Sequence, residues 1–90
     1  MSATLAVRHT VADYAAWRVA YESASVIRDK HGCTGEQVFQ APGDANDVFI
    51  THEFPTVGQA EAFAGDPALR QAMERGGVTA APRIEIFELA

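Results

Sequence analysis

The sequence has few of the features that mark exported, membrane-bound or nucleic-acid-binding proteins. Its single cysteine, Cys33, excludes an internal disulfide and a zinc site built from cysteines, and fits a reducing compartment. Seven Lys and Arg residues are scattered among twelve Asp and Glu residues, so we expect no basic surface for a phosphate backbone. No apolar run approaches the roughly 20 residues that span a bilayer, and the N-terminus lacks a signal-peptide core. These absences predict a cytoplasmic protein without a nucleic-acid or membrane partner.

The size and composition indicate one small folded domain. The chain has 90 residues, of which 48% are hydrophobic and 21% charged, as in ordinary globular proteins. A chain this short buries only about 60–65% of the surface that its unfolded form exposes, so its stability is marginal. We therefore expect a single domain over residues 1–90, stabilised by a partner chain.

Hydrophobic periodicity predicts the first half of the fold. Residues 4–10 alternate between two faces, which is the period of a strand. Asp13 is a suitable N-cap for one long helix from Tyr14 to about His31, which Gly32 ends in a left-handed conformation. The next two β-rich runs flank a cluster of turn-forming residues and predict a hairpin; they are residues 35–41 and 47–54.

The second half is predicted by caps and by a final alternating run. Thr56 and Gln59 resemble a capping box that opens a helix through Ala64, and Asp66-Pro67 starts a second helical piece after a break near Gly65. Residues 83–89 alternate again and predict the last strand. The order β-α-β-β-α-β predicts an α+β, ferredoxin-like fold, in which a four-stranded antiparallel sheet carries its helices on one face.

The other face of this sheet also carries apolar side chains. In the third strand Phe49 points away from Val48 and Ile50. Phe39 and Phe87 add aromatics to strands whose opposite positions are also partly apolar. A sheet with both faces apolar is covered on both sides, so we expect a second copy of the chain to pack sheet against sheet, with two-fold symmetry.

The first helix has the side chains best suited to chemistry. At ~100° per residue, one arc groups Tyr14, Trp17, Tyr21, Arg28 and His31, whereas the opposite arc is charged. Small alanines beside the large aromatics leave room for a cavity that an apolar ligand with a few polar groups would fill.

Each residue of this arc has two interpretations. Trp17 and Tyr21 could be core packing, and Arg28 and His31 could be cations that complement the helix dipole. In the functional interpretation His31 exchanges protons, and Arg28 and Tyr21 orient a developing oxyanion.

Two further histidines invite a metal hypothesis. His9 and His52 fall in neighbouring antiparallel strands but toward opposite ends of the sheet, about 10 Å or more apart at ~3.3 Å per residue. We therefore expect no metal site and consider both as substrate-binding residues, together with Tyr14 and Trp17. No stretch resembles a nucleotide-binding loop or a nucleophile elbow, so no cofactor is expected.

Several stretches together resemble a known family. The runs VRHTVADYAAWRVAYE and RDKHGCTGEQVF, the hairpin with Asp-Ala-Asn-Asp-Val, and EAFAGDPALRQAMERGGV followed by Pro82 are similar to the dimeric α/β-barrel proteins of the antibiotic biosynthesis monooxygenase superfamily. This superfamily includes cofactor-free oxygenases, haem degraders, cyclases and stress-responsive proteins.

The resemblance implies a homodimer whose two sheets form a barrel, with one ligand cavity per subunit between sheet and helices. In the oxygenase branch, Trp, Tyr, Asn and Arg side chains bind a substrate enolate that reacts with oxygen. Trp17, Tyr14, Tyr21 and Arg28 are candidate counterparts by residue type. Haem-degrading relatives have a histidine ligand in the second helix, which this chain lacks.

Three hypotheses follow. The first is a cofactor-independent enzyme of aromatic or polyketide-like metabolism, a monooxygenase or cyclase, with His31, Arg28 and Tyr21 as catalytic residues. The second is a non-catalytic dimeric module that binds a small apolar or aromatic ligand or responds to stress, and in which the same aromatics are core. The third is an isomerase or decarboxylase acting on small organic acids.

Overall fold

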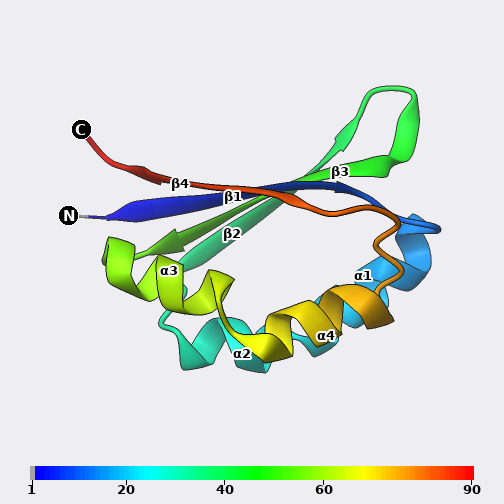
Figure 1. Cartoon of the computed structure of the whole chain (residues 1–90). Coiled ribbons are helices and arrows are strands. Elements are labelled where there is room, and N and C mark those ends of the chain that lie inside the picture. The colour runs from blue at the N-terminus through cyan, green and yellow to red at the C-terminus, as the bar shows by residue number, and fades with distance from the viewer. Residues whose placement is uncertain (1) are drawn as a thin grey trace.

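The computed structural model describes residues 2–90 and confirms the predicted order of elements. Within these residues, β1 (Ala3–Thr10), β2 (Gly35–Ala41), β3 (Asp44–Phe54) and β4 (Arg83–Glu88) form one antiparallel sheet in the order β2-β3-β1-β4. The helices lie on one face of this sheet (Figure 1); they are α1 (Tyr14–Ser23), α2 (Ser25–Lys30), α3 (Val57–Ala64) and α4 (Pro67–Arg75).

The hydrophobic core lies between this sheet and the helices. Leu5 and Val7 of β1 and Val48 of β3 are at most 1% exposed, whereas Phe49, on the other face of β3, is 39% exposed. This alternation is what a sheet with one face against helices requires. Phe63 of α3 packs into the same core and is 1% exposed.

The predicted helix caps are confirmed. The carboxylates of Asp13 and Asp66 accept backbone N–H bonds of 3.0 and 2.9 Å in the first turns of α1 and α4, and the Thr56 hydroxyl accepts one of 3.1 Å in α3. Gly32, with φ of +77°, follows α2 in the left-handed conformation. In residues 2–90 no helix has the length and apolar character needed to cross a membrane.

The prediction of one unbroken helix from Tyr14 to His31 is wrong. The helix is interrupted at Ala24, where φ and ψ are −85° and 7°. The Arg28 guanidinium donates a 2.9 Å hydrogen bond from Nη1 to the Tyr21 carbonyl oxygen, which a continuing helix would use for the N–H of residue 25. At the break the Tyr21 carbonyl thus accepts from the Arg28 side chain and from the Ala24 N–H at 3.1 Å.

The hairpin turn is tighter than predicted. β3 begins at Asp44 rather than residue 47, so only Pro42 and Gly43 separate the two strands, and Gly43 has a φ of +82° that favours glycine. The pairing register shifts between Gln40 and Ala41. This irregularity decides which residues of β2 and β3 lie opposite each other.

Candidate functional site

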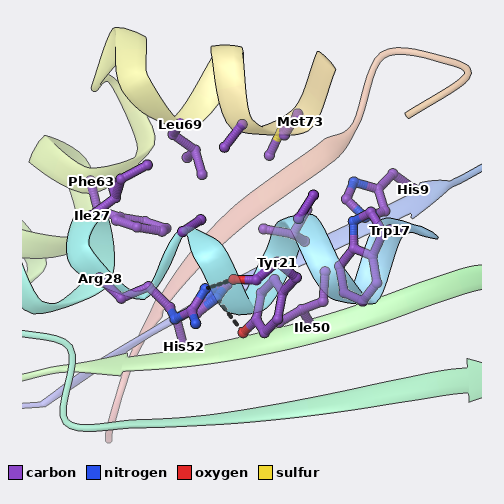
Figure 2. Close-up of a pocket in the computed structure, with 14 residues that line it drawn as sticks. His9, Trp17, Tyr21, Ile27, Arg28, Ile50, His52, Phe63, Leu69 and Met73 are labelled. Atoms are coloured by element: carbon purple, nitrogen blue, oxygen red, sulfur yellow. Dashed lines mark hydrogen bonds between the residues drawn. The ribbon is translucent and has the colours of Figure 1, made fainter. Parts of the chain in front are cut away.

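A cavity lies between the sheet and the helices, as predicted. It is lined by residues of β1, β3 and all four helices, and most of its lining is apolar (Figure 2). Ala20 and Ala24 are among the lining residues, so the small side chains of the helix do leave space beside the aromatics. The cavity has a volume of about 40 Å³, which is enough for a few water molecules.

Five of the seven predicted site residues line this cavity. They are His9, Trp17, Tyr21, Arg28 and His52. Figure 2 shows His9 and Trp17 toward one end and Arg28 toward the other. The strand register, in which His9 faces Val48 and His52 faces Leu5, confirms that the two histidines lie toward opposite ends of the sheet.

The other two predicted residues do not line the cavity. Tyr14 lies beside Trp17, and their ring centroids are 5.7 Å apart. The Tyr14 side chain is only half-buried. His31 ends α2, and its Nε2 lies 2.7 Å from Oδ2 of Asp66, the N-cap of α4. The expectation that His31 faces the cavity is therefore wrong, because its imidazole contacts the start of α4 instead. This contact also lowers the pKa of the Asp66 carboxyl to about 2.

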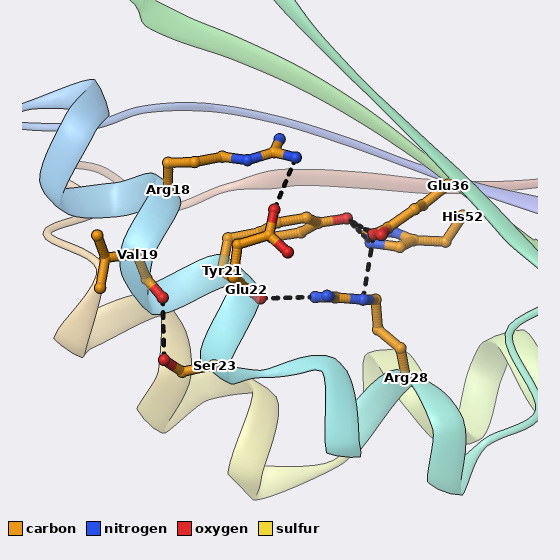
Figure 3. A network of polar contacts seen from close by, with 8 residues as sticks. All are labelled: Arg18, Val19, Tyr21, Glu22, Ser23, Arg28, Glu36 and His52. Carbon is orange, nitrogen blue, oxygen red and sulfur yellow. Dashed lines mark hydrogen bonds and ion pairs between the residues drawn. The ribbon is translucent and has the colours of Figure 1, made fainter.

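A polar cluster occupies the Arg28 end of the cavity (Figure 3). The Arg28 Nε lies 3.1 Å from Oε2 of Glu36, and its guanidinium is 4.1 Å from the centre of the Tyr21 ring. The Tyr21 hydroxyl donates a hydrogen bond to Glu36, and its oxygen is 3.1 Å from Nε2 of His52. One ion pair and two neutral side chains thus form a connected network beside an apolar space.

Burial sets the protonation states of this cluster. Desolvation, followed by the positive charge of Arg28, lowers the pKa of His52 to about 4. Desolvation also lowers the pKa of His9, and together with the hydrogen bond to Glu36 it raises the pKa of Tyr21. Near neutral pH both imidazoles are therefore uncharged and the phenol keeps its proton.

Three imidazole nitrogens of the cavity are buried without a partner in residues 2–90. They are both ring nitrogens of His9 and Nδ1 of His52. A buried polar atom without a hydrogen bond is destabilising by roughly 1–3 kcal/mol, so most proteins avoid such atoms. These nitrogens are available to a polar group that enters the cavity.

The aromatic residues of α1 are closely stacked. The rings of Trp17 and Tyr21 are 4.8 Å apart at 22°, and His9 meets Trp17 edge-on at 5.8 Å. Gly76, after α4, fits against this stack, since a Cβ there would lie 3.0 Å from Cδ1 of Trp17. Trp17 and Tyr21 are thus buried core residues that also line the cavity.

Sequence reasoning missed Glu36. This residue lies opposite His52 in the β2–β3 register, and it pairs with both Arg28 and Tyr21. Counted regularly from the Pro42-Gly43 turn, Glu36 would face Phe49, but the register shifts after Gln40. The predicted strand ends at residues 41 and 47 give the observed pairing with His52, so what the sequence did not reveal is the contact of Glu36 with Arg28 and Tyr21. No group of three or more His, Cys, Asp or Glu residues suited to a metal ion occurs among the described residues.

Solved structures of known proteins superpose on nearly the whole chain. SnoaB from Streptomyces nogalater, described as a cofactor-independent oxygenase, gives a TM-score of 0.80 at 10% identity, covering 99% of this chain and 93% of SnoaB. A Caulobacter crescentus protein provisionally described as an antibiotic biosynthesis monooxygenase gives 0.77 at 13% identity, covering 99% and 90%. Rv0793 from Mycobacterium tuberculosis gives 0.73 at 12% identity, covering 100% and 96%.

No protein-family model and no curated protein matches the sequence. The similarity to the solved structures is therefore one of backbone arrangement. It confirms the predicted ferredoxin-like fold, and it confirms the resemblance to the antibiotic biosynthesis monooxygenase superfamily at the level of that fold.

Proposed function

We propose that the protein binds and converts a small aromatic or polyketide-like molecule in the cavity between sheet and helices, as a cofactor-independent monooxygenase or a cyclase. The observation that carries this proposal is an apolar cavity lined by buried imidazole nitrogens that have no hydrogen-bond partner among residues 2–90. A flat apolar ligand with hydroxyl or carbonyl groups complements both features. Similarity in fold to SnoaB, described as a cofactor-independent oxygenase, supports this class of chemistry.

The proposal assigns proton exchange to His52 rather than to His31. The neutral His52 accepts a proton or a hydrogen bond from a substrate hydroxyl, and the cationic Arg28 beside it stabilises the resulting oxyanion. The enolate then reacts with oxygen in a monooxygenase, or with a carbonyl of the same molecule in a cyclase. Trp17 and Tyr21 provide the flat apolar wall.

A substrate needs more space than the cavity now offers. Pockets that bury a drug-sized ligand have volumes of about 300 Å³ or more, several times the 40 Å³ available here. α4 contributes Leu69 and Met73 to the cavity and is flanked by Gly65 and by Gly76-Gly77. We expect α4 to move outward when the ligand enters.

Fluorescence and oxygen uptake test the proposal together. Trp17 is the only tryptophan, so its emission reports directly on the cavity. Hydroxylated naphthalenes and anthrone should quench this emission saturably, and one of them should be consumed with uptake of oxygen or with ring closure. His52→Leu should abolish turnover, whereas His31→Ala should retain it. Neither quenching nor turnover with any such compound would refute the proposal.

A non-catalytic ligand-binding module is the second candidate. The small volume of the cavity and the close stacking of Trp17 on Tyr21 favour it. Saturable quenching without consumption of any quencher would support this module instead of the enzyme.

We further propose that the open face of the sheet forms a homodimer interface. Phe39 and Phe49 are 48% and 39% exposed there and contact each other, with ring centroids 6.0 Å apart. The same face carries charges of both signs, including the Arg8–Asp47 ion pair at 2.8 Å. A surface with both signs can complement a rotated copy of itself, as a two-fold interface requires.

Light scattering after size-exclusion chromatography tests the dimer. The wild-type protein should have twice the mass of the 90-residue chain, and Phe49→Glu should give the monomer mass because it buries a charge at the interface. Val19→Glu is the matched control, since Val19 is 68% exposed on α1, away from the open face. A monomeric wild-type protein would contradict this assignment.

A further inference from the structure

The protons of the polar cluster can be counted. Glu36 is paired with the Arg28 cation at 3.1 Å, so it is an ionised carboxylate that only accepts hydrogen bonds. The Tyr21 hydroxyl has one proton, and it donates that proton to Glu36. The 3.1 Å contact between the Tyr21 oxygen and Nε2 of His52 is then a hydrogen bond only if the imidazole is the donor.

We propose that Glu36, acting through Tyr21, is a positioning residue that holds His52 in its Nε2–H tautomer and keeps the Nδ1 lone pair free for a ligand. A neutral imidazole has one proton, so protonation of Nε2 leaves Nδ1 as an acceptor. That Nδ1 is buried and has no partner within residues 2–90. The use of Nδ1 by a ligand rests on the proposed function, whereas the tautomer of His52 does not.

The arrangement is built from separate parts of the chain. Tyr21 comes from α1, Glu36 from β2 and His52 from β3, where it faces Glu36 across the register. Glu36 does not line the cavity, and its side chain is 37% exposed. It therefore acts from outside the ligand space and touches the ligand only through the Tyr21–His52 pair.

His9 provides an internal contrast. It lines the same cavity and is 6% exposed, but both of its ring nitrogens lack a partner in the described part of the chain. No side chain there selects one tautomer of His9. Of these two cavity histidines, His52 alone has a carboxylate placed behind it within the described residues.

The arrangement predicts what a ligand must offer. A hydroxyl or N–H group on the ligand donates to Nδ1 of His52, whereas an ether or methylated hydroxyl cannot. When the proton transfers, the O–H bond of the ligand breaks, an Nδ1–H bond forms, and the negative charge stays on the ligand oxygen. The imidazolium then has Tyr21 and the Glu36 carboxylate behind its Nε2–H, which partly offset the burial and the Arg28 charge that disfavour the charged form.

Long-range ¹H–¹⁵N NMR of the histidine side chains tests the tautomer without ligand or turnover. The chain has three histidines, so the spectrum is simple. In the wild-type protein at pH 7, His52 should be at least about tenfold more Nε2–H than Nδ1–H. In Glu36→Gln the Tyr21 proton is free to turn to Nε2, so the Nδ1–H form should rise to within about threefold of the Nε2–H form or exceed it.

Three variants complete the test. Glu36→Asp keeps a carboxylate and should restore part of the Nε2–H excess. Tyr21→Phe removes the acceptor and should abolish that excess. Glu53→Gln is the matched control, because Glu53 adjoins His52 in sequence but accepts its hydrogen bond from Thr4 and should leave the tautomer unchanged.

The result that overturns the proposal is a wild-type His52 that is mainly Nδ1–H, or a folded Glu36→Gln protein with an unchanged tautomer ratio. Backbone amide spectra of each variant establish that it is folded. If the protein binds and converts no ligand, the proposed function fails, but the expected NMR results are unchanged. Failure of the proposed function can therefore be told apart from failure of the tautomer proposal.

Discussion

Acidification should destabilise this protein through His52 before its carboxylates begin to titrate. The side chain is 3% exposed, and burial beside Arg28 lowers its pKa from 6.5 to about 4. The unfolded chain binds a proton at this residue near pH 6.5, whereas the folded chain does so only near pH 4. Between these values the unfolded state holds more protons, so stability falls as the pH falls.

The size of the effect follows from the two pKa values. The contribution is fully present above pH 6.5, and by pH 5 roughly 2 kcal/mol of the free energy of unfolding is lost. That is a large part of the stability of a small domain, which is typically about 5–15 kcal/mol. Burial also lowers the pKa of His9, so this residue adds a loss of the same sign.

Urea unfolding of the wild-type protein and of His52→Gln at pH 7 and pH 5 measures this contribution. Glutamine does not titrate, and its amide can donate to the Tyr21 oxygen as Nε2–H does. The loss between the two pH values should be roughly 2 kcal/mol smaller in the variant, whatever its absolute stability. A common protein concentration keeps any contribution of self-association constant.

Equal losses in the two proteins, within about 0.5 kcal/mol, would refute the reasoning. They would mean that the His52 imidazole titrates alike in the folded and unfolded states, and so is not buried beside a cation. A variant that loses more stability on acidification than the wild-type protein would contradict the sign as well.

Two further predictions concern the ends of α4. Gly76→Ala should lower the free energy of unfolding by about 1–3 kcal/mol, because its Cβ would lie 3.0 Å from Trp17. Gly58→Ala in α3 should raise it by up to about 1 kcal/mol, because its Cβ would meet the Thr56 hydroxyl at an ordinary 3.9 Å. Urea unfolding compares the pair, and equal effects would contradict close packing on the indole. Asp66→Ala should destabilise the protein more than Asp13→Ala, because both remove an N-cap but only the first also removes contacts with His31 and Lys30 at the end of α2. Equal losses would show that these contacts contribute nothing.

The element order and the inward-facing residues could be predicted from the sequence because they depend on local signals. Alternation assigned the strands, and cap residues such as Asp13 and Asp66 assigned the starts of helices. The interior position of Trp17 and Tyr21 followed from their spacing on the first helix. Each of these signals is contained within a few residues of the feature that it predicts.

The features that were missed depend on contacts between distant residues. At the break at Ala24 the Arg28 side chain folds back on the Tyr21 carbonyl and also pairs with Glu36 of β2. The contact of Glu36 with Tyr21 likewise joins residues of different elements. His31, which a helical wheel places on the apolar arc, instead contacts Asp66 at the start of α4.

Arg28 connects the architecture to the candidate site. Its guanidinium ends the first helical segment, pairs with Glu36, and lies over the Tyr21 ring. A lysine has the charge but not the planar array of donors that makes these contacts simultaneously. The residue whose side chain bonds at the helix break is therefore also the ion-pair partner of Glu36, the carboxylate that accepts the Tyr21 proton. The helix break is in this sense part of the site, since an unbroken helix would place Arg28 elsewhere and leave the carboxylate beside the imidazole without its cation.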